Sequence, residues 1–331
     1  MIHLHFSTED LVRVRFSFSP VWEGVSSLRT LGAGRRNGLH TPWLRWVGSR
    51  LGDVDVDLLT AVVRPTGYIP DFLHPTLSHR SAGFEHGLAE VAATDPELVA
   101  AELSHLAEHR VAQQGPGREG RVRTLRELAG EPRAGLARIV AELDRYWRVA
   151  VEPHWSRIEA LLQADLKYRL DQLATGGVEL LFRTLHPSLR FEDDTLEIVK
   201  YYDGHAELRD RGLLLVPCVF AWPDVIVRTA DPQPAVTYSP RGVGRLWESP
   251  AGAGRAPLVD VLGRSRATIL TQLDLPMSTT QLADQLDRTA PTLNVHLKAL
   301  QAAGIVSARR TGRTVLYART ELGDSLVAGP E

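Results

Sequence analysis

The fold of the C-terminal part of this chain is decided by residues 278–306, which read Ser278-Thr-Thr-Gln-Leu-Ala-Asp-Gln-Leu-Asp-Arg-Thr-Ala-Pro-Thr-Leu-Asn-Val-His-Leu-Lys-Ala-Leu-Gln-Ala-Ala-Gly-Ile-Val306. Ser278 and Gln281 have the spacing of a capping box, in which two side chains satisfy backbone N–H groups at a helix start. Pro291 suits the first turn of a second helix, because its missing N–H would have no partner there. The stretch therefore predicts two helices joined by a tight turn.

The second predicted helix begins near Ala290 and has two different faces. Leu293, Leu297 and Leu300 recur at helical spacing and should face the core, while Gly304 stands where a helix commonly ends. On the opposite face, Asn can bond adenine, Val and Thr methyl groups can touch thymine, and Lys can bind guanine or phosphate. The residues expected to contact DNA from this segment are Thr289, Pro291, Thr292, Asn294, Val295, His296 and Lys298.

A basic β-hairpin follows the second helix. Residues 305–310 and 313–318 alternate as strands around Thr311-Gly312, which leaves Arg309, Arg310 and Arg313 near the tip. Arginines on a protruding hairpin can clamp phosphates or enter the minor groove. Helix, turn, helix and hairpin in this order predict a winged helix-turn-helix with double-stranded DNA as its partner.

These segments resemble the winged-helix domain of ArsR-type bacterial repressors over roughly residues 258–327. Repressors of this type usually place a Ser where this chain has Asn294. The resemblance implies a homodimer that reads a palindromic operator, together with release from DNA when a small-molecule effector binds. It makes transcription regulation, as a repressor, the expected function.

Metal sensing of the thiolate type is not expected. Thiolate sensors of this family carry cysteines on the first helix of the motif, where this chain has Gln281-Leu-Ala-Asp-Gln-Leu-Asp287. The single cysteine, Cys218, lies in an apolar run, where a buried structural thiol is expected. Residues 320–331 contain no His that could build a terminal site. The sequence therefore predicts no metal and no cofactor.

Two domains are expected in the 331 residues. Pro and Gly become dense from Asp231 to Pro257, which marks a boundary. We expect residues 1–250 to form a mixed α/β domain for effector sensing or dimerisation, and residues 257–331 to form the winged helix-turn-helix. The first of these resembles the uncharacterised N-terminal domain of actinobacterial ArsR-like regulators.

The N-terminal region reads as mainly helical with a later β-rich portion. Helices are predicted at residues 20–31, 42–51, 54–63, 83–93, 96–112, 122–128, 132–146 and 153–174, the last ended by Gly176-Gly177. Strands are predicted at residues 2–6, 189–191, 196–202, 212–219 and 225–228. The fold class expected for the whole chain is therefore α+β, mainly helical.

Charge and composition set further bounds. The net charge is −2, so DNA affinity must come from a local patch, and residues 257–319 supply one with eight Arg or Lys against four Asp. No signal peptide is evident, and no apolar run approaches the roughly 20 residues that a membrane helix needs. A cytoplasmic protein without a membrane partner is expected.

The alternatives concern the N-terminal region. His105-Leu-Ala-Glu-His109 matches the spacing of some zinc peptidases, which leaves metal binding or hydrolase activity as a second hypothesis. A solvated helix face explains this segment more simply, and we expect no enzyme. An organic effector would suit aromatic side chains near charged groups. The candidate ligand residues are Tyr68, Phe72, Trp147, Trp155, Phe220 and Trp222.

Overall fold

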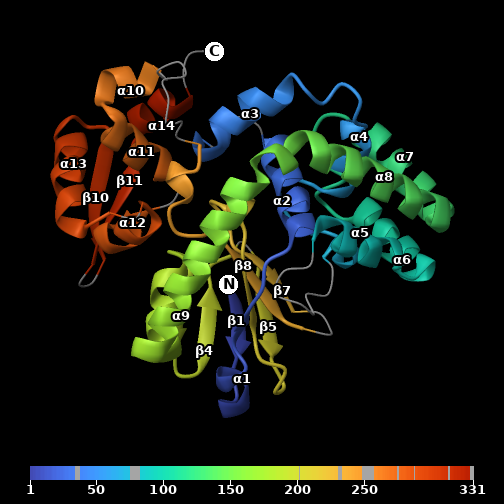
Figure 1. The fold of residues 1–331 in the computed structure, drawn as a ribbon, viewed down its shortest axis with the longest axis horizontal. Coiled ribbons are helices and arrows are strands. Elements are labelled where there is room, and N and C mark those ends of the chain that lie inside the picture. The colour runs from blue at the N-terminus through green and yellow to red at the C-terminus, as the bar shows by residue number, and fades with distance from the viewer. Residues whose placement is uncertain are drawn as a thin grey trace. The chain divides into compact units, whose positions relative to one another are not determined.

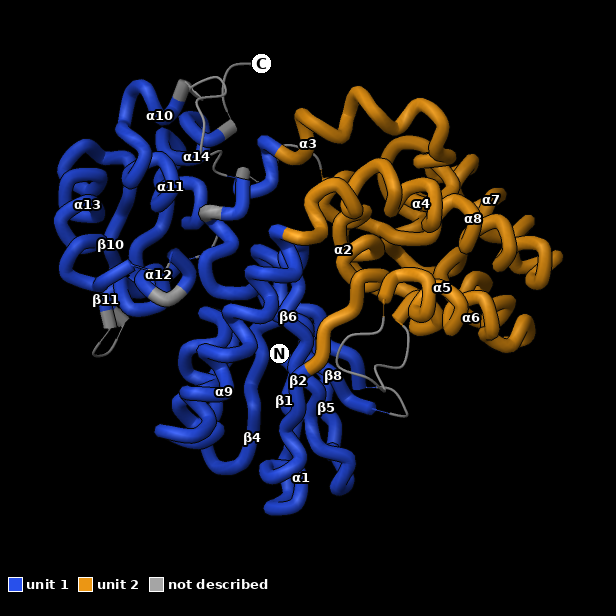
Figure 2. The backbone as a smooth tube through the Cα atoms, viewed as in Figure 1, with its two compact units in different colours: residues 1–16, 35–42, 157–331 blue, residues 17–34, 43–156 orange. Residues whose placement is uncertain are grey.

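The computed structural model describes residues 1–33, 38–74, 83–200, 202–229, 233–247, 257–273, 276–286, 288–311 and 314–328. The chain is α+β and mainly helical, as the sequence predicts (Figure 1). It divides into two compact units, coloured separately in Figure 2. Unit 1 comprises residues 1–16, 35–42 and 157–331, and unit 2 comprises residues 17–34 and 43–156.

Unit 2 is helical, and α2 is its central element. Residues 20–30 of α2 are all buried, and the Ser27 hydroxyl lies 2.8 Å from the hydroxyl of Tyr146 on α8, so this buried polar pair is satisfied. The helices are α2 (Pro20–Ala33), α3 (Thr41–Gly48, whose first two residues belong to unit 1), α4 (Val56–Val62), α5 (Phe84–Ala92), α6 (Pro96–Glu108), α7 (Arg118–Gly130) and α8 (Pro132–Ala150), with short η3 (Asp71–Leu73) and η4 (Glu152–His154).

Unit 1 contains two four-stranded sheets besides the C-terminal winged helix. Sheet A has the order β3-β4-β1-β5, and its strands are β1 (Ile2–His5), β3 (Leu189–Glu192), β4 (Thr195–Ile198) and β5 (Gly204–Glu207). Sheet B has the order β2-β6-β8-β7, with β2 (Arg15–Phe16), β6 (Leu214–Pro217), β7 (Ile226–Arg228) and β8 (Ala235–Tyr238). Between β1 and β2 lies α1 (Thr8–Val12).

The two sheets share one hydrophobic core with the long helix α9 (Trp155–Leu185). Leu4 and Leu196 of sheet A, Leu215 and Val236 of sheet B and Phe182 of α9 all belong to this cluster. The predicted end of the long helix at Gly176-Gly177 corresponds to a break, because Gly177 has φ +63° and ψ −165°, a conformation almost restricted to glycine. Helical structure resumes after it and continues to Leu185.

A fully buried polar network joins α9 to β8. Asp165 accepts hydrogen bonds from the hydroxyl of Tyr238 at 2.8 Å and from the backbone N–H of Arg241 at 2.8 Å. Arg169 lies four residues on and pairs with Asp165 through Nε at 3.4 Å. Burial and the charge of Asp165 raise the pKa of Tyr238 well above its usual range. Asp165 and Arg169 are therefore an i,i+4 pair within the core.

The Pro- and Gly-rich stretch that begins at Asp231 is not simply a linker. Ala235–Tyr238 forms β8, which is wholly buried between β6 and β7. Its neighbour η6 (Val243–Arg245) follows Gly242, whose backbone N–H donates to the carbonyl of Gln285 at 2.6 Å. Short η5 (Val219–Ala221) and η2 (Gly38–His40) complete this part of unit 1. Residues 248–256, where the domain boundary is predicted, lie outside the described residues, so that boundary stays a prediction.

The C-terminal elements follow the order of a winged helix-turn-helix. They are α10 (Pro257–Leu262), α11 (Arg264–Gln272), β9 (Met277–Ser278), α12 (Thr279–Leu286), α13 (Ala290–Ala302), β10 (Val306–Thr311), β11 (Thr314–Arg319) and α14 (Glu321–Ala328). The capping box is confirmed: the backbone N–H of Ser278 donates to Gln281 Oε1 at 2.9 Å, and that of Gln281 donates to Ser278 Oγ at 3.2 Å. Gly304 has φ +71°, the left-handed conformation expected after a helix end.

Candidate nucleic-acid interface

Helix α13 presents a polar face because its leucines are buried on the other side. Leu293, Leu297 and Leu300 are at most 2 % exposed, which fixes the rotation of the helix about its axis. Val295 on the opposite side is 68 % exposed, so its methyl groups are accessible to a partner. Thr289, Pro291, Thr292, Asn294 and Lys298 are likewise exposed.

The start of α13 is organised by two threonines. Thr289 is the residue that precedes the helix, and its hydroxyl lies 2.8 Å from that of Thr292. Because Pro291 supplies no N–H, the first turn has fewer donors to satisfy. The exposed hydroxyls and Asn294 therefore gather at the N-terminal end of the helix, the end with which helix-turn-helix proteins contact bases.

His296 differs from the other residues expected to contact DNA. It is half-buried, and its Nδ1 is buried with no hydrogen-bond partner among the described residues. It lines a small cavity of about 50 Å³ together with Thr268, Arg264 and Arg288. The position of His296 at the margin of the exposed face favours a role in packing between α11 and α13.

The wing is an antiparallel hairpin whose two described arginines occupy adjacent positions. Arg309 lies opposite Leu316 and Arg310 opposite Val315 on the partner strand, and both arginines are exposed. Successive side chains of a strand point to opposite faces, so the two guanidinium groups flank the hairpin on both sides. Arg313, the third predicted wing arginine, lies outside the described residues.

Arg319 attaches the wing to the helices. Its Nε lies 2.7 Å from Asp324 Oδ1 on α14, and its Nη1 donates to the carbonyl of Leu270 on α11 at 3.1 Å. The Leu270 carbonyl is in the last turn of α11, where its one backbone bond, from the N–H of Leu273, is long at 3.3 Å. The wing, α11 and α14 are thus held together by one largely buried side chain.

Comparison with known protein families adds to this geometry. Residues 76–242, half of the chain, match the family of unknown function DUF5937. The chain belongs to this family. Residues 263–307 match a helix-turn-helix domain family of the ArsR type, and this range runs from α11 to the start of the wing. No curated protein and no solved structure matches this DUF5937 chain. Its helix-turn-helix supports the function of a DNA-binding regulator.

The aromatic residues predicted to bind an effector lie in both units of the DUF5937 protein. Phe72 and Trp147 are buried in unit 2, where Trp147 stacks on Phe84, and Phe220 and Trp222 are buried in unit 1. Core packing accounts for these four side chains. Tyr68 and Trp155 are half-buried and retain accessible surface. Cys218 is buried, as predicted.

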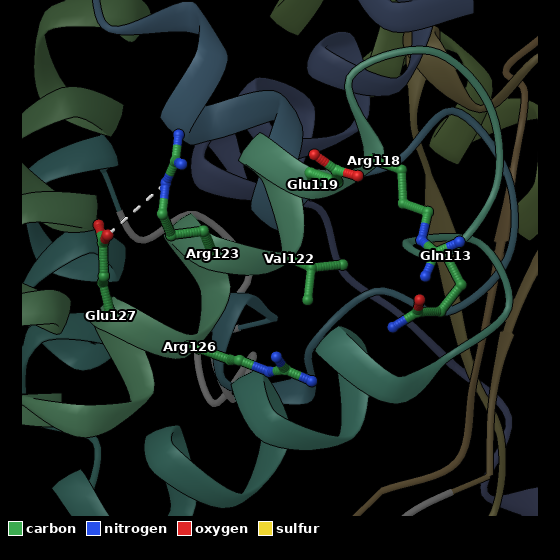
Figure 3. A pocket seen from close by; sticks show the side chains of 7 residues that line it. All are labelled: Gln113, Arg118, Glu119, Val122, Arg123, Arg126 and Glu127. Atoms are coloured by element: carbon green, nitrogen blue, oxygen red, sulfur yellow. Dashed lines mark ion pairs between the residues drawn. The ribbon is translucent and has the colours of Figure 1, made fainter.

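A groove of about 500 Å³ runs along α7. Figure 3 shows the side chains that line it, among which Arg118, Arg123 and Arg126 come from successive turns of the helix and Glu127 pairs with Arg123 at 3.9 Å. None of the predicted aromatic residues lines this groove. Most of its lining residues are charged and none is aromatic, so it differs from the pocket of aromatic side chains near charged groups that the sequence suggests.

The His105–His109 segment of the DUF5937 protein lies at the end of α6, without a third potential metal ligand among the described residues. Helix α6 ends at Glu108, and His109 is extended, with its Nδ1 accepting from the backbone N–H of Val111 at 3.3 Å. Both rings pack near Tyr68 instead. Burial, and then the charge of His105, lower the pKa of His109. The backbone N–H of His109 still donates to the carbonyl of His105 at 2.9 Å, so both imidazoles lie on one side of the helix end, with ring centroids 5.8 Å apart.

Three potential metal ligands were not predicted from the sequence. His5, His205 and Glu207 offer ligand atoms that all lie within 4.8 Å of one another, and this is the one such group among the described residues. His5 belongs to β1, and the other two belong to β5, about 200 positions later in the chain. The detectable signal was the alternation His3-x-His5 and His205-x-Glu207, which puts each pair on one face of a strand.

Within the described ranges, no helix combines the length and the apolarity needed to cross a bilayer.

Proposed function

We propose that this protein is a transcriptional repressor that binds a palindromic operator as a homodimer and leaves it when an organic effector binds. The observation that carries the proposal is the exposed polar N-terminal half of α13, held in place by three buried leucines. A helix presented in this way can enter the major groove, and two copies related by a two-fold axis read half-sites about one helical turn apart.

In this proposal the two parts of the winged helix have different tasks. Asn294 reads a base, because a carboxamide can bond bidentately to adenine, and Val295 touches a thymine methyl. Arg309, Arg310 and Arg313 of the wing bind phosphates, which contributes affinity without sequence preference. Effector binding is assigned to the N-terminal region, where Tyr68 and Trp155 are the candidate aromatic residues that remain partly accessible.

The base-reading role can be tested by fluorescence anisotropy with DNA upstream of the protein's own gene and a scrambled duplex of equal length. Asn294→Ala should reduce the preference for the upstream DNA by about 1–3 kcal/mol for each half-site, with little effect on binding to the scrambled duplex. Arg310→Ala should weaken binding to both duplexes alike. Gln114→Ala, which removes an exposed amide in unit 2, is the matched control.

Equal affinity of the wild-type protein for both duplexes would refute operator reading. An unchanged preference in Asn294→Ala would refute the assignment to that residue. Light scattering coupled to size exclusion should give the mass of two chains, and a single-chain mass when bound to the operator would refute the homodimer.

A further inference from the structure

The exposed face of sheet A brings together histidines and a carboxylate from two neighbouring strands. β1 and β5 lie side by side (Figure 1). They pair in parallel, with His3 opposite His205 and His5 opposite Glu207. Because side chains on a strand alternate, His5 shares this face with both β5 residues. The His5 and His205 rings are 4.4 Å apart between centroids, and His205 Nε2 lies 3.7 Å from Glu207 Oε1.

We propose that His5, His205 and Glu207 form a binding site for one divalent transition-metal ion such as Zn²⁺. Two imidazoles and one carboxylate are a ligand set that proteins use for zinc and other first-row metals. Ligand atoms that each lie about 2.1 Å from one ion are at most about 4.2 Å apart. The observed separations, within 4.8 Å, need only small rotations, and the side chains of His205 and Glu207 are 65 % and 60 % exposed and can make them.

A hydrogen-bond chain prepares His5 for this role. The Thr195 hydroxyl donates to the backbone carbonyl of Asp193 at 3.2 Å, and its oxygen lies 3.0 Å from His5 Nδ1. A hydroxyl has one proton to give, so with that proton committed to Asp193 the oxygen accepts the Nδ1–H of His5. This tautomer leaves the lone pair on Nε2. Partners of this kind orient metal-binding histidines in characterised sites, and Thr195 is therefore a positioning residue.

A metal ion at this site would link the edge strand of sheet A to its neighbour. Among the described residues, β5 pairs with β1 alone, and a metal ion bound by both strands adds a cross-link beside their hydrogen bonds. Three protein ligands leave at least one coordination position for water or another small ligand. This inference does not depend on DNA binding.

The test is a titration of the metal-stripped, full-length protein, purified without a histidine tag, with Co²⁺ followed by absorption and with Zn²⁺ followed by calorimetry. We expect one equivalent to bind. His5→Ala and Glu207→Gln should each weaken binding by more than about tenfold. Thr195→Val should weaken it by about 10–100-fold, and Thr195→Ser should restore it.

A matched control exists in unit 2. His86 and Glu90 of α5 also form a His–carboxylate pair, 3.5 Å apart, without a third potential ligand among the described residues. His86→Ala should leave metal binding unchanged. Far-UV circular dichroism and the unfolding midpoint of each metal-free variant show whether it is folded. The proposal is overturned if the wild-type protein binds no equivalent, if folded His5→Ala and Glu207→Gln bind as tightly as wild type, or if His86→Ala loses the same binding.

Discussion

Removal of the two described wing arginines should make DNA binding less sensitive to salt. Each phosphate that a cation neutralises contributes about −0.9 to the slope of log K against log salt concentration for duplex DNA. Arg309 and Arg310 are exposed on opposite faces of the hairpin, so both can reach a phosphate. The double change Arg309→Ala with Arg310→Ala should therefore make the slope less steep by about 1.8 for each wing that touches DNA.

This change in slope corresponds to a measurable difference in affinity. Raising the salt from about 50 mM to about 200 mM weakens DNA binding. For each wing that touches DNA, this loss of affinity should be about 12-fold smaller in the double variant than in wild type. The assay is fluorescence anisotropy on one labelled duplex at four or more salt concentrations. Arg133→Ala, which removes an exposed arginine of α8, is the control and should leave the slope unchanged. A slope equal to that of wild type in the double variant would show that the wing does not contact phosphates.

Three further predictions concern stability. Leu297→Ala should lower the free energy of unfolding by about 2–5 kcal/mol in chemical denaturation because this fully buried side chain leaves a cavity. Arg319→Ala should cost about 1–3 kcal/mol in the same assay, since it removes both the ion pair with Asp324 and the hydrogen bond to the Leu270 carbonyl. Burial lowers the pKa of His40 and of His186 from 6.5 to about 3. Between these values the unfolded chain holds a proton that the folded protein lacks, so urea unfolding should show stability falling with decreasing pH by about 1.4 kcal/mol per unit for each histidine.

The controls for these predictions use nearby positions. Val295→Ala lies on the same helix as Leu297 but is exposed, and Arg266→Ala removes an exposed arginine from α11, so both should change stability by less than about 0.5 kcal/mol. Below about pH 6.5, His40→Gln should reduce the slope of the free energy of unfolding against pH by the amount that one proton contributes. Equal losses of stability in Leu297→Ala and Val295→Ala would contradict the cavity argument. An unchanged stability in Arg319→Ala would contradict the role of Arg319, and a wild-type pH profile in His40→Gln would contradict the role of His40.

The sequence predicted most of what depends on neighbouring residues. The Ser278–Gln281 capping box, the leucine stripe of α13 and the left-handed Gly304 each follow from local rules, because the interacting groups are at most a few residues apart. The break of α9 at Gly177 belongs to the same class. Local patterns therefore sufficed for the part of the protein that matches the helix-turn-helix family.

What the sequence did not reveal depends on distant pairing. β8 has only four residues and lies among prolines and glycines, so its burial follows from pairing with β6 and β7 and not from its own pattern. The cluster of His5 with His205 and Glu207 requires β1 to pair with β5, which no local periodicity specifies. The division of residues 17–156 into a separate helical unit likewise follows from packing between segments.

The pairing of the first strand also affects how the chain folds during synthesis. Leu4 of β1 lies opposite Leu196 of β4, so β1 leaves the ribosome long before its partners exist. At translation rates of about 5–20 residues per second, this delay is about 10–40 s. The helices of unit 2 come from the intervening chain and can pack during that interval. Sheet A therefore forms late, and a nascent chain stalled before residue 195 would expose the apolar face of β1, with Ile2 and Leu4, as a target for chaperones.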